Sequence, residues 1–96
     1  MKQPCVYLLA SRSHGTLYVG VTSDLIKRVW QHKNNLVEGF TSKYHVHVLV
    51  WFEQHATMEL AIAREKQLKA GNRNRKIALI EASNPNWLDL YESLLG

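Results

Sequence analysis

One acidic residue lies where a charged side chain is costly. The apolar residues of a helix predicted over residues 57–71 fall within an arc of about 120°, at about 100° per residue; they are Met58, Ala61, Ile62 and Leu68. Glu65 projects close to the middle of this arc. A carboxylate there is unfavourable unless a cation, a metal ion or a hydrogen-bond donor meets it. Glu65 is therefore a candidate ligand, and the alternatives are pairing with an arginine at the core edge or extension into solvent.

An arginine and a histidine flank an earlier predicted helix. This helix covers residues 25–35 and is capped by Ser23 or Asp24. Arg28 and His32 lie one turn apart at the edge of its apolar stripe, which consists of Leu25, Val29 and Leu36. The planar guanidinium can donate two hydrogen bonds to two phosphate oxygens, so Arg28 suits a phosphate-binding site. The alternative is an ordinary solvated helix flank.

Two tyrosines lie on adjacent predicted strands. Residues 6–10 and 17–21 are apolar runs separated by a turn-like segment, which indicates a β-hairpin. If the register pairs an odd with an even position, Tyr7 and Tyr18 share one sheet face; packing alone is the alternative. Gly20 in the second strand indicates that another group approaches the backbone closely.

The remaining elements complete a small α+β domain. Residues 34–42 are predicted to form a loop, 45–53 a third strand, 73–82 a helix and 87–95 a final short helix. Thr57 is the expected cap of helix 57–71, and Gly71 its left-handed terminator. The order is β-β-α-β-α-α-α, which predicts a three-stranded antiparallel sheet flanked by helices, in a single domain over residues 1–96.

Charge and composition favour an acidic partner and exclude several functions. The net charge is +4, and six cations between residues 64 and 76 face one acid. Cys5 is the only cysteine, so neither an intramolecular disulfide nor a thiolate zinc site is expected. No phosphate-binding glycine loop or nucleophile elbow occurs. No apolar run is long enough to span a membrane, and a cytoplasmic protein without a membrane partner, monomeric by default, is expected.

The ordered motifs resemble the GIY-YIG (URI) nuclease domain. Cys5-Val6-Tyr7 stands in place of the first motif and Tyr18-Val19-Gly20 in place of the second. The helical segments Leu25-Ile26-Lys27-Arg28 and Ala63-Arg64-Glu65 also fit. Phe40-Thr41-Ser42-Lys43-Tyr44 and Asn84-Pro85-x-Trp87 are similar to the small stand-alone UPF0213 or YhbQ-like branch, and the resemblance covers residues 4–90.

The resemblance implies an endonuclease and assigns its residues. Catalytic roles are implied for Tyr7, Tyr18, Arg28, His32 and Glu65, with Glu65 holding Mg²⁺ or Mn²⁺, while Gly20 belongs to the structural motif. The sequence departs from the family at Gly39-Phe40-Thr41, where some homing members have a histidine, and an asparagine of excision-repair members matches Asn72 or Asn74 only loosely.

The expected reaction is metal-dependent hydrolysis of phosphodiester bonds in nucleic acid. DNA, structured or single-stranded, is favoured over RNA, and the expected process is DNA repair or processing. The cations expected to bind the backbone are Lys43, Arg64, Lys66, Lys69, Arg73, Arg75 and Lys76. Two alternatives stay open: a non-catalytic nucleic-acid-binding module, and a protein-interaction domain with an idle site.

Overall fold

The computed structural model describes residues 3–37 and 39–96 and has the predicted α+β architecture. Its elements are β1 (Cys5–Ala10), β2 (Leu17–Thr22), α1 (Leu25–Lys33), α2 (Phe40–Lys43), β3 (Val48–Gln54), α3 (Met58–Ala70), α4 (Arg73–Ser83) and α5 (Tyr91–Leu94). The strands form one sheet in the order β2-β1-β3, and both pairings are antiparallel. The predicted fold class is confirmed.

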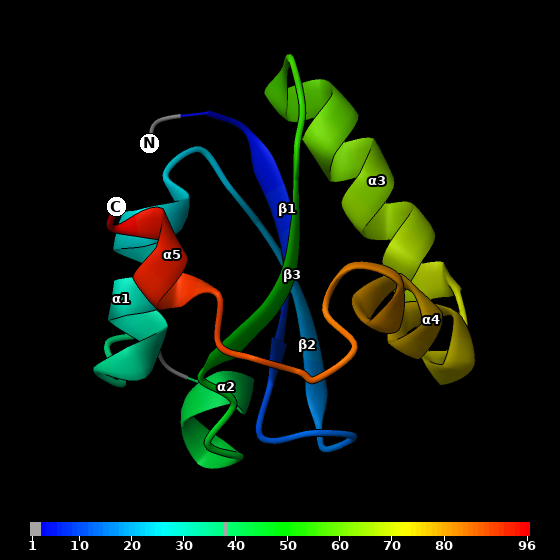
Figure 1. The fold of residues 1–96 in the computed structure, drawn as a ribbon. Coiled ribbons are helices and arrows are strands. Elements are labelled where there is room, and N and C mark those ends of the chain that lie inside the picture. Colours follow the sequence, from blue (N-terminus) through cyan, green and yellow to red (C-terminus); the bar gives the residue numbers. More distant parts are fainter. Residues whose placement is uncertain (1–2, 38) are drawn as a thin grey trace.

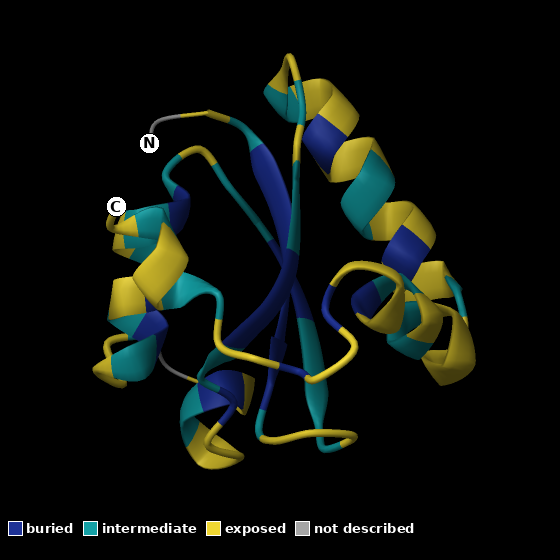
Figure 2. Ribbon diagram, in the orientation of Figure 1, coloured by how far each residue is buried: buried dark blue, intermediate teal, exposed yellow. Residues whose placement is uncertain are grey.

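Helices cover both faces of the sheet and create two apolar layers (Figure 1). The first layer joins Val6 and Leu8 of β1 to Leu68 of α3 and Ile80 of α4. The second joins Tyr7 and Leu9 of the same strand to residues of α1 and α5. All six residues of β1 are therefore buried, which appears as the dark central strand in Figure 2. A strand enclosed on both faces needs this continuous apolar sequence.

The hairpin register sets which side chains share a face. Tyr7 pairs with Gly20, and Leu9 pairs with Tyr18. Odd positions of β1 therefore lie opposite even positions of β2, as the sequence allowed. Because side chains alternate between the two faces, Tyr7 and Tyr18 lie on the same side of the sheet, diagonal to one another.

Local capping fixes the helix starts. The side chains of Asp24, Thr57 and Asn72 each accept a hydrogen bond from a backbone N–H three residues later. The caps predicted at Asp24 and Thr57 are confirmed. Gly71 does end α3, but the prediction of a left-handed terminator is wrong: its φ is −78° and its ψ is 164°. Its N–H instead bonds to the carbonyls of Gln67 and Leu68.

The segment before β3 differs from the sequence prediction. Residues 34–42 were expected to be loop, but Phe40–Lys43 form the short helix α2. Strand β3 begins at Val48 and not at residue 45, because His45 has a φ of 55° and Val46 N–H bonds to Thr41 O. Leu36 lies beyond the end of α1 and is 60% exposed, so it does not extend the buried stripe.

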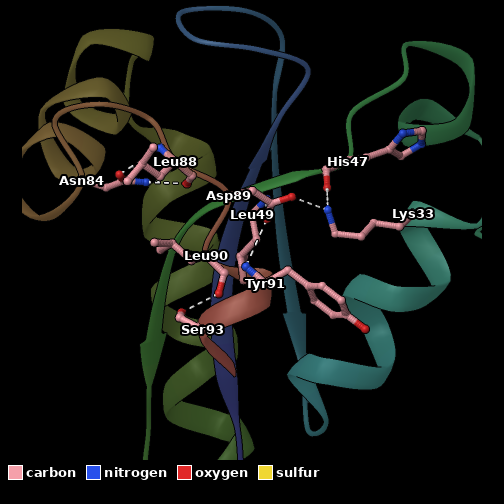
Figure 3. Close-up of polar contacts among 9 residues, drawn as sticks. All are labelled: Lys33, His47, Leu49, Asn84, Leu88, Asp89, Leu90, Tyr91 and Ser93. Carbon is pink, nitrogen blue, oxygen red and sulfur yellow. Dashed lines mark hydrogen bonds and ion pairs between the residues drawn. The ribbon is translucent and has the colours of Figure 1, made fainter. Parts of the chain in front are cut away.

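The C-terminal segment is held by side-chain polar contacts (Figure 3). Asn84 bonds to the backbone of Leu88, and Asp89 accepts hydrogen bonds from the N–H groups of Leu49 and Tyr91. Asp89 also pairs with the ammonium of Lys33 on α1. The predicted helix over residues 87–95 shrinks to α5, because these contacts satisfy the backbone in a non-helical path.

No helix in the described part of the chain has the length and apolar character needed to cross a membrane.

Candidate functional site

The ring of Tyr7 lies directly over the backbone of Gly20. A Cβ atom at position 20 would come within 2.3 Å of Tyr7 Cζ and 2.4 Å of the hydroxyl oxygen. Every residue other than glycine would therefore collide with the ring. The expectation that Gly20 permits a close approach is confirmed, and the approaching group is Tyr7.

A buried hydrogen-bond chain continues from the Tyr7 hydroxyl. This hydroxyl lies 2.9 Å from His32 Nε2, and His32 Nδ1 lies 3.0 Å from Thr41 Oγ1. The three residues are at most 2% exposed. His32 is therefore not part of a solvated helix flank, because Tyr7 and Tyr18 of the hairpin and Thr41 of α2 pack against it.

Their surroundings keep the Tyr7 hydroxyl and the His32 imidazole uncharged. Burial, then the charges of Arg28 and His47, lowers the pKa of His32 to about 4. Burial is also the main reason that the pKa of Tyr7 is raised, with the nearby Tyr18 and Glu65 adding to the rise and Arg28 opposing it. Since Arg28 is within hydrogen-bonding reach of the Tyr7 oxygen, the consistent arrangement has Tyr7 donating to His32 and His32 donating to Thr41.

Tyr18 lies between the buried Tyr7–His32–Thr41 hydrogen bonds and the protein surface. Its ring centroid is 6.3 Å from that of Tyr7 and 5.4 Å from that of His32. Unlike Tyr7, which is 1% exposed, Tyr18 is only partly buried. Of the two phenols that share this face, Tyr18 is the one open to a bound molecule.

Arg28 borders an open groove at the end of β2. The groove has a volume of about 720 Å³ and is lined by the end of β2 and the first turns of α1, including Asp24, Lys27, Arg28 and Gln31. Arg28 Nη1 lies 3.4 Å from Gln31 Oε1. The guanidinium is thus oriented at the rim of a polar groove, where it could bind an anionic group.

Glu65 reaches the same region from α3, which packs along β2 and β1. Its carboxylate is 15% exposed and lies 3.2 Å from the ammonium of Lys69, a half-exposed side chain one turn further. The predicted apolar arc is only partly buried, since Ile62 is 36% exposed. The structure thus contains an ion pair, as one alternative expected, but the partner is Lys69 on the same helix and not an arginine. The Glu65 charge nevertheless acts on Tyr7.

The five predicted site residues therefore converge from three separate parts of the chain. Tyr7 and Tyr18 come from the hairpin, Arg28 and His32 from α1, and Glu65 from α3. Thr41 was missed as a hydrogen-bonding partner of His32. In the sequence, Thr41 stood out only as part of Phe40–Tyr44, the segment that is similar to the UPF0213 branch, and that similarity suggested no role for its hydroxyl.

The donors present suit one class of metal. Among residues 3–37 and 39–96, no three His, Cys, Asp or Glu side chains lie together as a metal-binding group. The charge of Glu65 adds to the rise of the Tyr7 pKa, so this carboxylate lies near the site. Mg²⁺ typically binds one or two carboxylates together with waters and substrate phosphates, and Mn²⁺ accepts similar ligands. Glu65 therefore fits an ion that is completed by water and a phosphate.

Most of the predicted nucleic-acid-binding cations already contact protein groups. Arg64 pairs with Glu53, and Lys76 donates to Gly71 O. Arg73 donates to the carbonyls of His14 and Gly15 at 2.6 and 2.7 Å, and thereby ties α4 to the hairpin turn. Within the described residues, Lys66 and Arg75 are exposed without such a partner. Lys43 lies on α2, with its ammonium 5.5 Å from the Tyr44 ring centroid.

Comparisons with known proteins find a related family, a related sequence and a related fold. The GIY-YIG catalytic domain model matches residues 3–78. The UPF0213 protein SSP2268 of Staphylococcus saprophyticus is 30% identical over 80 residues, covering 83% of this chain and 96% of the relative. The solution structure of the UPF0213 protein BH0048 from Bacillus halodurans superposes with a TM-score of 0.56 at 23% identity, covering 91% of this chain and 92% of that one.

With the family model spanning more than three quarters of its length, the chain belongs to the GIY-YIG nuclease family and, within it, to the UPF0213 proteins.

Proposed function

We propose that this protein is a metal-dependent endonuclease that hydrolyses phosphodiester bonds in DNA. The observation that supports the proposal best is the cluster around Tyr7: His32 and Tyr18 pack against its ring, the charges of Arg28 and Glu65 act on its hydroxyl, and Arg28 also lines a polar groove. A binding module needs cations on its surface. It does not need a buried Tyr–His pair next to an arginine and a carboxylate.

Each of these side chains has a distinct task in the proposed reaction. Arg28 binds the scissile phosphate and compensates the negative charge that builds up in the transition state. Tyr18, the accessible phenol, positions the attacking water and, in its phenolate form, accepts the proton that the water loses. Tyr7, which is hydrogen-bonded to His32, holds the Tyr18 ring in place and excludes water from the buried side of that ring. Glu65 would hold a divalent ion, which polarises the phosphate and stabilises the leaving oxygen when bound.

Burial distinguishes the two tyrosines. Tyr7 is 1% exposed, so a proton taken up by its hydroxyl has no direct route to solvent. Burial also raises the pKa of Tyr7, which disfavours the phenolate that a general base requires. Tyr18 lies within the same aromatic cluster but retains exposed surface. We therefore assign the proton-accepting role to Tyr18 and a positioning role to Tyr7.

The test is cleavage of a panel of single-stranded, duplex, flapped and branched DNA and RNA with Mg²⁺ or Mn²⁺. Glu65→Gln should abolish metal-dependent cleavage and leave nucleic-acid affinity largely unchanged. Because the lost contact is an ion pair within one helix to the half-exposed Lys69, unfolding free energy should change by only about 0.5 kcal/mol or less.

Glu59→Gln is the matched control, since Glu59 lies on the exposed face of the first turn of α3. This variant should cleave normally and lose at most about 1 kcal/mol through the helix dipole. A folded Glu65→Gln protein that cleaves at the wild-type rate would refute the assignment. Tight binding without cleavage of any substrate would favour the non-catalytic nucleic-acid-binding module.

A further inference from the structure

Three aromatic rings form a continuous row that leads outward from the site. The Tyr18 and Phe40 rings are stacked, with centroids 6.3 Å apart and planes 26° apart. The Phe40 and Tyr44 centroids are 4.8 Å apart. Phe40 is 45% exposed and Tyr44 is 47% exposed. Two large rings, one on α2 and one at its C-cap, thus keep nearly half their surface in water, although Phe40 stacks on the partly buried Tyr18.

The backbone that carries these rings is firmly anchored. Thr41, between Phe40 and the end of α2, is 2% exposed and bonds to His32. Val46, just beyond α2, is fully buried and donates its N–H to Thr41 O at 2.9 Å. The exposure of Phe40 and Tyr44 is therefore built into an ordered helix. A rigid aromatic surface binds a flat partner without a large ordering cost.

The charge around the row favours an anionic partner. The ammonium of Lys43 lies 5.5 Å from the Tyr44 ring centroid. The sequence from Gly39 to Val48 contains no aspartate or glutamate. On the other side of Tyr18, the groove beside α1 presents Lys27 and Arg28. Aromatic rings between cations match a nucleic-acid strand, which alternates flat apolar bases with phosphates.

We propose that Phe40 and Tyr44, with Lys43, form a stacking platform for unpaired bases of a single-stranded nucleic acid that runs past Tyr18 into the Arg28 groove. Bases in a duplex are stacked on each other and cannot offer their faces to a protein ring. The inference rests on the proposed function, because it places the scissile phosphate next to Tyr18. It adds that the substrate is single-stranded, or locally unpaired, on the α2 side of the cut.

Binding in the Glu65→Gln background tests the platform without cleavage. The probes are a fluorescein-labelled single-stranded DNA oligonucleotide and the same strand annealed to its complement. Phe40→Ala and Tyr44→Ala should each weaken single-strand binding by about 5- to 150-fold, the range observed for loss of one base-stacking contact. Duplex affinity should change by less than about threefold, since it depends on phosphate contacts.

Conservative variants separate stacking from general apolar contact. Phe40→Trp and Tyr44→Phe should retain single-strand affinity, and Phe40→Leu should lose it although it stays apolar. Trp30→Ala is the matched control: Trp30 is 49% exposed and lies about 200° around α1 from Arg28, away from the groove. This control should bind like its parent.

Three outcomes would overturn the platform. Equal losses on single strands and duplex, or unchanged affinity in both alanine variants, would show that no base stacks there. Wild-type protein that self-associates, with Phe40→Ala and not Phe40→Leu returning it to monomer, would identify the row as a contact between copies. If wild-type protein binds and cleaves nucleic acid and the two alanine variants bind equally well, only the platform proposal is refuted. If wild-type protein binds no nucleic acid, the proposed nuclease function is refuted as well.

Discussion

Replacement of Gly20 by alanine should displace the Tyr7 ring, and the structure sets the size of the effect. The new Cβ would lie 2.3 Å from Tyr7 Cζ, whereas carbon atoms in contact are about 3.5–4.0 Å apart, so the ring must retreat by about 1 Å or more. It has little room, because it is 1% exposed and its hydroxyl is bonded to His32. Overpacking of this kind costs about 1–3 kcal/mol.

Two smaller terms adjust this figure in opposite directions. Loss of the Tyr7–His32 hydrogen bond adds about 0.5–1.5 kcal/mol. Alanine in a strand recovers about 0.5–1 kcal/mol relative to glycine. We therefore expect Gly20→Ala to lower the unfolding free energy by about 0.5–4 kcal/mol, measured by urea denaturation followed by tryptophan fluorescence. Cleavage should fall by about 100-fold, since a misplacement of 1 Å in a catalytic constellation has effects of this size.

Gly71→Ala is the matched control, because a Cβ there has no atom closer than 3.5 Å and the backbone φ is −78°. That variant should be as stable as wild type or up to about 1 kcal/mol more stable. In a double-mutant cycle, Tyr7→Leu should abolish the additional cost of Gly20→Ala by removing the colliding ring atoms. A Gly20→Ala protein with wild-type stability and activity would refute the reasoning, and so would an undiminished cost in the Tyr7→Leu background.

Three further predictions concern pH, salt and the C-terminal segment. Since burial and the neighbouring charges hold the pKa of His32 at about 4, below its ordinary 6.5, the unfolded chain takes up this proton first as pH falls. The free energy of unfolding should decrease by up to about 3 kcal/mol between pH 6.5 and 4. Urea denaturation of His32→Gln at several pH values should show a smaller decrease over this range, and an equal decrease in both proteins would contradict the prediction. Nucleic-acid affinity should fall steeply with salt: a plot of log affinity against log salt concentration should have a slope of about −0.7 to −0.9 per phosphate contacted. Lys66→Gln or Arg75→Gln should reduce the size of that slope by about 1, whereas a salt-insensitive affinity would exclude phosphate binding. Asp89→Ala should destabilise the fold by about 1–2 kcal/mol in thermal melting, because two backbone N–H groups lose their acceptor, and an unchanged melting temperature would show that water replaces it.

Short-range patterns accounted for the elements that were predicted well. The hairpin, α1, α3 and α4 follow from apolar periodicity and from capping side chains within three residues of the helix start. The parity of the hairpin register was left open by the sequence; once an odd position pairs with an even one, as the structure shows, the alternation of side chains places Tyr7 and Tyr18 on a common face. Gly20 was recognisable because a glycine inside a strand signals a close neighbour.

The elements that were predicted poorly depend on partners distant in the chain. Helix α2 contains Thr41, whose hydrogen bond to His32 joins two segments nine residues apart. The short α5 depends on Asp89, which bonds to Leu49 forty residues earlier. No local periodicity encodes such contacts, because each becomes favourable only after the sheet has brought the segments together.

The candidate site divides in the same way between sequence and tertiary structure. The sequence by itself determined which side chains could do chemistry: two phenols on adjacent strands, an arginine and a histidine one turn apart, and a carboxylate on a later helix. The tertiary structure decided their environments: Tyr7 and His32 became buried, Tyr18 stayed accessible, and Glu65 paired with Lys69. Residue type fixes the functional group of a side chain. Its exposure, pKa and partners depend on the dielectric and the neighbours that packing provides.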